Sequence, residues 1–153
     1  MKKFRYSMEN LLQVKQKLED QMKIAYGNAR LKLTQEEEKL EQLKKKKVLL
    51  EEDLRSLRSG RLNLLNIRQC ELYIDFTNTA IKQQTMAVKN AAQRLEVARI
   101  RLNDAMTERK TQERLKEKAW GEYLLEFEAE EKKEIDELNS YNYSNPALDE
   151  EDR

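Results

Sequence analysis

Histidine is absent from this chain, and the sequence holds only one cysteine, Cys70, one proline and three glycines. Without histidine, a Ser-His or Cys-His nucleophile system cannot form, and the most common zinc and iron ligand is missing. The three glycines do not supply the glycine-rich loop that binds phosphates or dinucleotides. We therefore predict no catalytic residue, no cofactor and no metal site, and a protein that is not an enzyme.

Long apolar runs and a second cysteine are also missing. No uninterrupted apolar segment approaches the roughly 18 residues that a membrane span needs. The basic start, residues 1–5, is not followed by the apolar segment of a secretory signal. Cys70 has no partner for an internal disulfide, which fits a reducing compartment. These features predict a soluble, cytoplasmic protein.

Charged residues make up 39% of the chain, hydrophobic residues 39% and aromatic residues 7%. This composition is typical of long helices, and its apolar content suffices for a narrow seam between helices but not for a broad globular core. The net charge is +1, yet residues 126–153 hold eleven acidic and three basic side chains. The pattern indicates a basic body and an acidic end.

Apolar residues first recur at alternating steps of three and four, the heptad pattern of a coiled coil. The seam predicted for the first helix comprises Phe4, Met8, Leu11, Lys15, Leu18, Met22, Ala25, Ala29, Leu33, Glu36, Leu40, Leu43, Lys47, Leu50, Leu54 and Leu57. Two consecutive steps of four, from Ala25 to Leu33, predict a stutter that locally unwinds the supercoil. The start is open between a helix capped by Ser7 and one beginning near Lys3.

Ser59-Gly60 is the strongest break, because a glycine just past the last periodic leucine is a helix C-cap signal. A second, slimmer seam follows, comprising Ile74, Thr77, Ile81, Gln84, Val88, Ala91, Leu95, Ala98, Leu102, Ala105, Arg109, Gln112, Lys116, Ala119 and Tyr123. We predict an all-α protein: a first coiled-coil helix over 1–58, a turn over 59–68, a second helix over 69–139 and an acidic, disordered tail over 140–153.

A short connection places two long helices antiparallel, as a coiled-coil hairpin. The second helix is the longer one, so it overshoots the first over about residues 119–138. This overshoot contains the apolar residues Trp120, Tyr123, Leu124, Phe127, Ile135 and Leu138. They form either a partner-binding stripe or, if the turn lies elsewhere, an internal contact.

Nucleic acid is not an expected partner. Basic clusters occur at residues 44–47 and at Arg55, Arg58 and Arg61, but acidic residues interrupt the first helix at Glu41 and over 51–53. The near-neutral total charge removes most of the electrostatic attraction that binding to phosphates needs.

The opening Phe4-Arg5-Tyr6-Ser7-Met8-Glu9-Asn10-Leu11-Leu12, followed by Val14-Lys15 and Lys17-Leu18-Glu19, resembles the start of the FliJ family. FliJ proteins are small coiled-coil components of the bacterial flagellar type III export apparatus. The break near Gly60 and the segment from Glu131 to Leu138 are also similar to that family, so the resemblance covers nearly the whole chain.

The resemblance implies an antiparallel two-helix coiled coil similar to the central stalk γ subunit of rotary ATPases. The end carrying both termini would insert into the pore of the hexameric flagellar export ATPase and promote its assembly and activity. On this reading the ATPase-binding residues are Phe4, Tyr6, Leu11, Leu12, Trp120, Tyr123 and Phe127. Export chaperones and the cytosolic part of the membrane export gate are the other implied partners. The protein would lie at the cytoplasmic face of the inner membrane, held there through protein contacts only.

For the gate contact, the family uses an aromatic residue and a leucine one turn later, near the start of the second helix. Tyr73 and Phe76 match the aromatic part of this pattern, but Ala80 stands at the leucine position, with Ile81 beside it. The resemblance therefore implies a gate contact at these residues that departs from the family pattern. The alternative function is a structural or tethering coiled coil without an ATPase partner.

Overall fold

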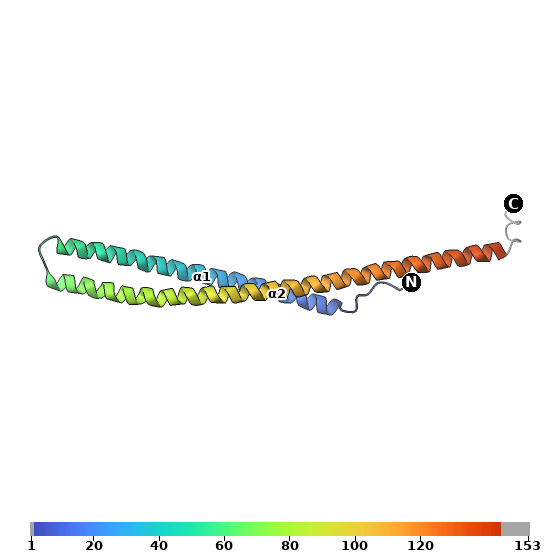
Figure 1. The fold of residues 1–153 in the computed structure, drawn as a ribbon, viewed down its shortest axis with the longest axis horizontal. Helices are drawn as coiled ribbons and strands as arrows, with labels where there is room; N and C mark the ends of the chain where they lie inside the picture. Colours follow the sequence, from blue (N-terminus) through green and yellow to red (C-terminus); the bar gives the residue numbers. More distant parts are fainter. Residues whose placement is uncertain (1, 145–153) are drawn as a thin grey trace. The chain divides into compact units, whose positions relative to one another are not determined.

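The computed structural model describes residues 2–144. Within that range it contains two helices and no strand: α1 spans Glu9–Arg58 and α2 spans Leu64–Ser144. Figure 1 shows α1 and α2 side by side, joined by the short connector at residues 59–63. Two contacts show that the helices run in opposite directions. The Cys70 sulfur lies 3.4 Å from the carbonyl of Leu50, near the end of α1, whereas Glu108, farther along α2, pairs with Lys15, near the start of α1. The predicted fold, an antiparallel hairpin of two long helices with the second one longer, is confirmed.

The chain forms two compact units. One, here called the hairpin unit, comprises residues 19–105 and includes the connector. The other, the terminal unit, comprises residues 1–18 together with 106–153. Each unit contains part of α1 and part of α2, so each has its own stretch of helix-to-helix packing.

The inward-facing side of α1 follows one heptad pattern without interruption. Its inner residues are Leu12, Lys15, Glu19, Met22, Tyr26, Ala29, Leu33, Glu36, Leu40, Leu43, Lys47, Leu50, Leu54 and Leu57. The predicted stutter is therefore wrong. Leu11 and Ala25 are exposed, and the seam uses the residue after each of them, Leu12 and Tyr26. Glu19 takes the position between these two and is only 4% exposed, with Lys23 Nζ 3.2 Å from its carboxylate. Apolar character pointed to the wrong residue because this seam tolerates a paired carboxylate.

The predicted seam of α2 is confirmed, since every residue assigned to it is buried or half-buried. Its most deeply buried members are small: Thr77, Ala91 and Ala105 are each at most 5% exposed. Small side chains at these positions let two helix backbones approach closely. The packed face also extends beyond the prediction, back to Cys70 and forward to Phe127.

The connector is shorter than the predicted turn over 59–68. Helix α1 ends at Arg58, and the amide of Ser59 still donates to the carbonyl of Arg55 at 3.1 Å. Asn63 then caps α2: its side-chain oxygen accepts from the amide of Asn66 at 3.4 Å, and its carbonyl accepts from the amide of Ile67 at 3.1 Å. An asparagine at the N-cap satisfies an amide of the first turn, and α2 accordingly begins at the next residue, Leu64.

Gly60 follows the end of α1 as the sequence indicated, but not as a left-handed cap. No glycine within residues 2–144 has a positive φ angle. At this break the carbonyl of Ser56 accepts a hydrogen bond from the hydroxyl of Ser59 at 2.9 Å.

In the terminal unit, α1 begins at Glu9, two residues past Ser7, and the amide of Leu12 donates to the carbonyl of Met8 at 3.0 Å. Residues 2–8 precede the helix and are called the N-terminal strap below. Helix α2 continues to Ser144, so residues 140–144 of the predicted tail are helical. The remainder of that tail, residues 145–153, lies outside the described residues.

Candidate functional site

The described part of the chain shows neither a metal-binding group of side chains nor a membrane-spanning helix. Residues 2–144 contain no group of three or more Cys, Asp or Glu side chains arranged to hold a metal ion. No helix in that range is long and apolar enough to cross a membrane.

Four aromatic side chains gather in the terminal unit. Phe4 of the strap packs edge-on against Trp120 with ring centroids 5.0 Å apart, and lies 5.3 Å from Tyr123. Tyr123 in turn stacks on Trp120 at 5.5 Å and lies 6.3 Å from Phe127. The α2 members occupy one side of the helix because their spacing of three and four residues repeats with the helical turn. Phe4, Trp120, Tyr123 and Phe127 are called the aromatic cluster below.

Polar contacts hold the strap and the first turns of α1 to α2. The hydroxyl of Tyr123 donates to the backbone carbonyl of Lys2 at 3.0 Å, and that of Tyr6 donates to Gln112 at 3.3 Å. Salt bridges of 2.8 Å join Lys116 to Glu9 and Lys15 to Glu108. The strap is therefore fixed at several points by residues far away in sequence.

The structure divides the predicted ATPase-binding residues. It brings four of them together in the aromatic cluster: Trp120 and Tyr123 have an internal partner in Phe4, and Phe127 contacts Tyr123. Leu12 is 4% exposed and packs between the helices, whereas Trp120 keeps 45% of its surface exposed. The expected single-helix overshoot therefore begins later than residue 119: residues 128–144 are all exposed. We call residues 128–144 the free end of α2.

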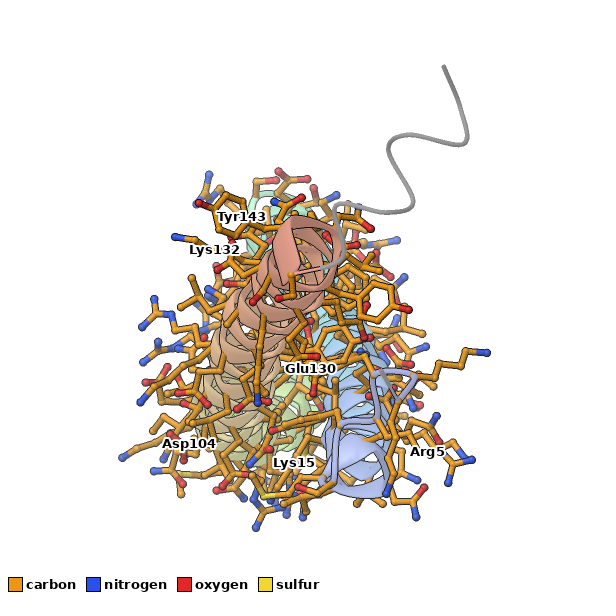
Figure 2. All side chains as sticks on the ribbon, turned by 90° about the vertical axis from the view of Figure 1, so that its right-hand side faces the viewer. Arg5, Lys15, Asp104, Glu130, Lys132 and Tyr143 are labelled. Atoms are coloured by element: carbon orange, nitrogen blue, oxygen red, sulfur yellow. The ribbon has the colours of Figure 1, made fainter. Side chains whose placement is uncertain are left out.

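The sequence pattern placed Phe4 in a helical seam and did not reveal that its ring packs on Trp120 and Tyr123 of α2. It also missed the charge pattern beside the aromatic cluster. Lys2, Lys3 and Arg5 of the strap line a hollow together with a mostly acidic stretch of α2, which contributes Glu122, Glu126, Glu130, Glu134 and Glu137 as well as Lys133. Figure 2 looks at the molecule from this end, with Arg5 on the strap and Glu130 and Lys132 on α2. The spacing of these glutamates by three and four residues is visible in the sequence and could have revealed the stripe.

A second surface lies on α2 close to the connector. Phe76 is 75% exposed, and Leu72 and Tyr73 are also exposed. Ala80 and Ile81 are half-buried, and Ile81 belongs to the packed seam. The apolar surface around Phe76 therefore extends toward the connector, through Leu72, instead of toward Ala80. Sequence reasoning missed Leu72, which lies one helical turn before Phe76.

A polar layer interrupts the packing of the hairpin unit. Glu36 of α1 is 7% exposed and accepts a hydrogen bond from the side-chain amide of Gln84 on α2. Lys32 Nζ lies 2.8 Å from the same carboxylate, and Lys39 lies 3.6 Å away. The hydrogen bonds from Lys32 and Gln84 lower the pKa of Glu36 to about 2, against the opposing effect of burial. This carboxylate is therefore charged at neutral pH and serves packing.

Comparisons with known proteins agree with this architecture. The flagellar FliJ protein family matches residues 4–148. Among solved structures, a proposed YscO homolog, CT670 from Chlamydia trachomatis, is similar with a TM-score of 0.63 and 21% sequence identity, over 99% of this chain and 100% of that one. Comparison with curated protein sequences gives no match. The structural likeness reflects the shared fold, while the family match extends over almost the whole sequence. The chain therefore belongs to the flagellar FliJ family, and this membership implies a component of a type III protein export apparatus.

Proposed function

We propose that this protein is the central stalk of the flagellar export ATPase and promotes assembly and activity of the ATPase hexamer. The observation that carries the proposal is the free end of α2, which continues as a single exposed helix past the aromatic cluster. In Figure 1 this segment is the orange-to-red end of α2, extending beyond the N-terminal strap. A single helix is narrower than a hairpin and so fits the pore of a ring more readily.

Exposed apolar residues on and next to the free end support contact with a partner. Leu125 lies just before it, and Ile135, Leu138 and Tyr141 lie on it; all four are more than half exposed. Apolar side chains repeated along one helix outside any internal packing are typical of a surface that a partner covers. The aromatic cluster would add a wider collar at the base of the free end, with Trp120 still partly available.

The test is ATP hydrolysis by the purified flagellar export ATPase, measured across a range of concentrations of this protein. We expect turnover to rise together with ring assembly. A triple variant, Leu125→Gln, Ile135→Gln and Leu138→Gln, should abolish the rise while retaining helicity, because these side chains are largely exposed in the isolated chain. Replacing Trp120, Tyr123 and Phe127 with alanine should also abolish it.

The matched control is Ile24→Gln, Leu31→Gln and Leu49→Gln, three comparably exposed apolar residues on α1 of the hairpin unit. This variant should stimulate the ATPase as the unmodified protein does. Absence of stimulation by the unmodified protein would overturn the stalk role and leave a structural or tethering coiled coil. Equal loss in the control would show that the effect does not come from the free end.

We further propose that the surface of Leu72, Tyr73 and Phe76 contacts the cytosolic part of the export gate, with Ala80 and Ile81 at its edge. Its exposure and its match to the aromatic part of the family pattern support this. Phe76→Ala should weaken binding to the purified cytosolic gate domain, while Phe4→Ala should leave that binding unchanged. The reverse result would place the gate contact at the aromatic cluster.

Export chaperones are the remaining proposed partners, and the proposed location is the cytoplasmic face of the inner membrane. Membership in the FliJ family supports both proposals. Co-purification of the chain with export chaperones, in the presence and absence of the ATPase, is the measurement that tests them.

A further inference from the structure

The connector end of the hairpin unit has a composition unlike the rest of the chain. Residues 54–70 contain four arginines and no aspartate or glutamate, although 29 acidic residues are spread over the sequence. The arginines are Arg55, Arg58, Arg61 and Arg68, and all four are exposed. The nearest carboxylates are Asp53 and Glu71, and Glu71 pairs with Arg58 at 3.0 Å. We call residues 55–69 the hairpin tip.

Three leucines stand among these arginines. Leu62 is 64% exposed in the connector, and Leu64 and Leu65 are each 76% exposed in the first turn of α2. Surface loops are usually polar, and a group of exposed leucines at a loop tip is typical of a binding surface. The leucines are not needed to form the turn, because Asn63 caps α2 through its own side chain.

From this arrangement we propose that the hairpin tip binds directly to an anionic lipid surface. Leucines at the boundary of the acyl chains, surrounded by arginines at the level of the headgroups, form the usual pattern of a peripheral membrane contact. The guanidinium groups pair with lipid phosphates and carboxylates, while the leucine side chains leave water for the interface. This contact is separate from the proposed gate contact and from the ATPase contact, and it adds a lipid partner to the protein partners.

Other occupants fit the tip less well. A second copy would bring four arginines against four arginines without an acidic residue between them. Nucleic acid would pair with the arginines, but its phosphate backbone gives no role to three exposed leucines. An anionic membrane surface uses both features at once.

The test is sedimentation of the full-length chain with vesicles of phosphatidylcholine alone or of phosphatidylcholine mixed with phosphatidylserine. We expect binding to the mixed vesicles that weakens as salt rises. Two variants separate the contributions, Leu64→Gln with Leu65→Gln, and Arg61→Gln with Arg68→Gln. Each should lower the partition coefficient by about tenfold, because insertion and headgroup pairing both contribute. Asn63 is left intact in both, and circular dichroism verifies the helix content.

Matched controls carry the same substitutions elsewhere: Leu31→Gln with Leu49→Gln on α1, and Arg101→Gln with Arg114→Gln on α2. All four positions are exposed, and both variants should bind vesicles as the unmodified chain does. Phe76→Ala should also retain binding, since that residue lies outside the tip.

Failure to bind the mixed vesicles, equal binding to phosphatidylcholine alone, or equal loss in the control variants would overturn the proposal. So would retention of a short DNA or RNA duplex with the same dependence on Arg61 and Arg68 in place of vesicle binding. Loss in Phe76→Ala alone would move the lipid contact away from the tip and overturn its assignment.

Discussion

Gln84 of α2 donates its side-chain amide both to the carboxylate of Glu36 and, at 2.9 Å, to the backbone carbonyl of the same residue on α1. The Gln84 side chain thus contacts both the carboxylate and the backbone carbonyl of one residue on the opposite helix. Sliding the helices by one heptad would take Gln84 away from Glu36: the carboxylate would keep Lys32 and Lys39 of its own helix, but the Gln84 amide would lose both of its acceptors, and an unmet hydrogen bond in a packed seam is costly. We infer that this polar layer fixes the register of the hairpin unit.

The polar layer predicts a pH dependence of stability. The pKa of Glu36 in the folded protein, about 2, lies below the ordinary glutamate pKa of 4.5. Its contribution to stability is therefore fully present above about pH 4.5 and is lost as the pH falls toward 2, because the unfolded chain takes up the proton first. Glu36→Gln should lower the urea midpoint at pH 7, and the difference from the unmodified protein should narrow toward pH 2. Glu38→Gln, on the exposed side of α1, is the control; a difference that stays constant with pH would contradict the prediction.

The aromatic cluster predicts that removing the Phe4 ring, which anchors the strap, lowers the stability of the terminal unit. Phe4→Ala should destabilise the terminal unit by about 1–2 kcal/mol, since it removes two aromatic contacts and a partly buried ring. Trp120 is the only tryptophan, so its fluorescence reports on this region alone and should shift to longer wavelength. Phe76→Ala makes the same substitution at a 75% exposed position and should change neither quantity. An unchanged Trp120 spectrum in Phe4→Ala would contradict the packing of the strap.

The small residues of the α2 seam predict that a larger side chain at one of these positions lowers the stability of the protein. Ala91→Leu adds bulk at a 5% exposed position and should cost about 1–3 kcal/mol through overpacking. Ala129→Leu, at an exposed position of the same helix, should have little effect. Thermal unfolding followed by circular dichroism compares the two variants, and a higher melting temperature for Ala91→Leu would show that the helices have room to separate.

The open surroundings of Gly27 predict that replacing it with alanine stabilises the protein. Gly27 lies inside α1, and a Cβ atom added there meets nothing within 4 Å. Gly27→Ala should therefore stabilise the protein by about 0.5–1 kcal/mol, because alanine loses less backbone entropy in a helix. Urea unfolding measures the gain. Gly121→Ala has equally open surroundings and should behave in the same way; destabilisation by either substitution would indicate a contact that covers the glycine.

The seam of α2 could be predicted residue by residue, and that of α1 from Ala29 to Leu57, whereas nearer the start of α1 the prediction failed at several positions. In α2 the small and apolar residues from Ile74 to Tyr123 coincide with the heptad positions. In α1 the competing residues Leu11, Leu18 and Ala25 stand one position ahead of Leu12, Glu19 and Tyr26. Choosing by hydrophobicity selected the first set. The packed face instead uses Leu12 and Tyr26, and between them it buries Glu19, paired with Lys23 at 3.2 Å, next to a half-buried Leu18.

The sequence by itself determined two long antiparallel helices, the location of the break and the greater length of α2. These features depend on local periodicity, on the scarcity of glycine and proline and on chain length. Only the tertiary structure decided that Phe4 packs on Trp120 and Tyr123, that the strap lies against the acidic side of α2, and that exposed apolar surface gathers at the hairpin tip. The contacts of the strap join residues more than a hundred positions apart, and their partners are set by the register of the two helices, which no single segment encodes. The exposure of the tip leucines depends in turn on where the connector leaves the packed seam.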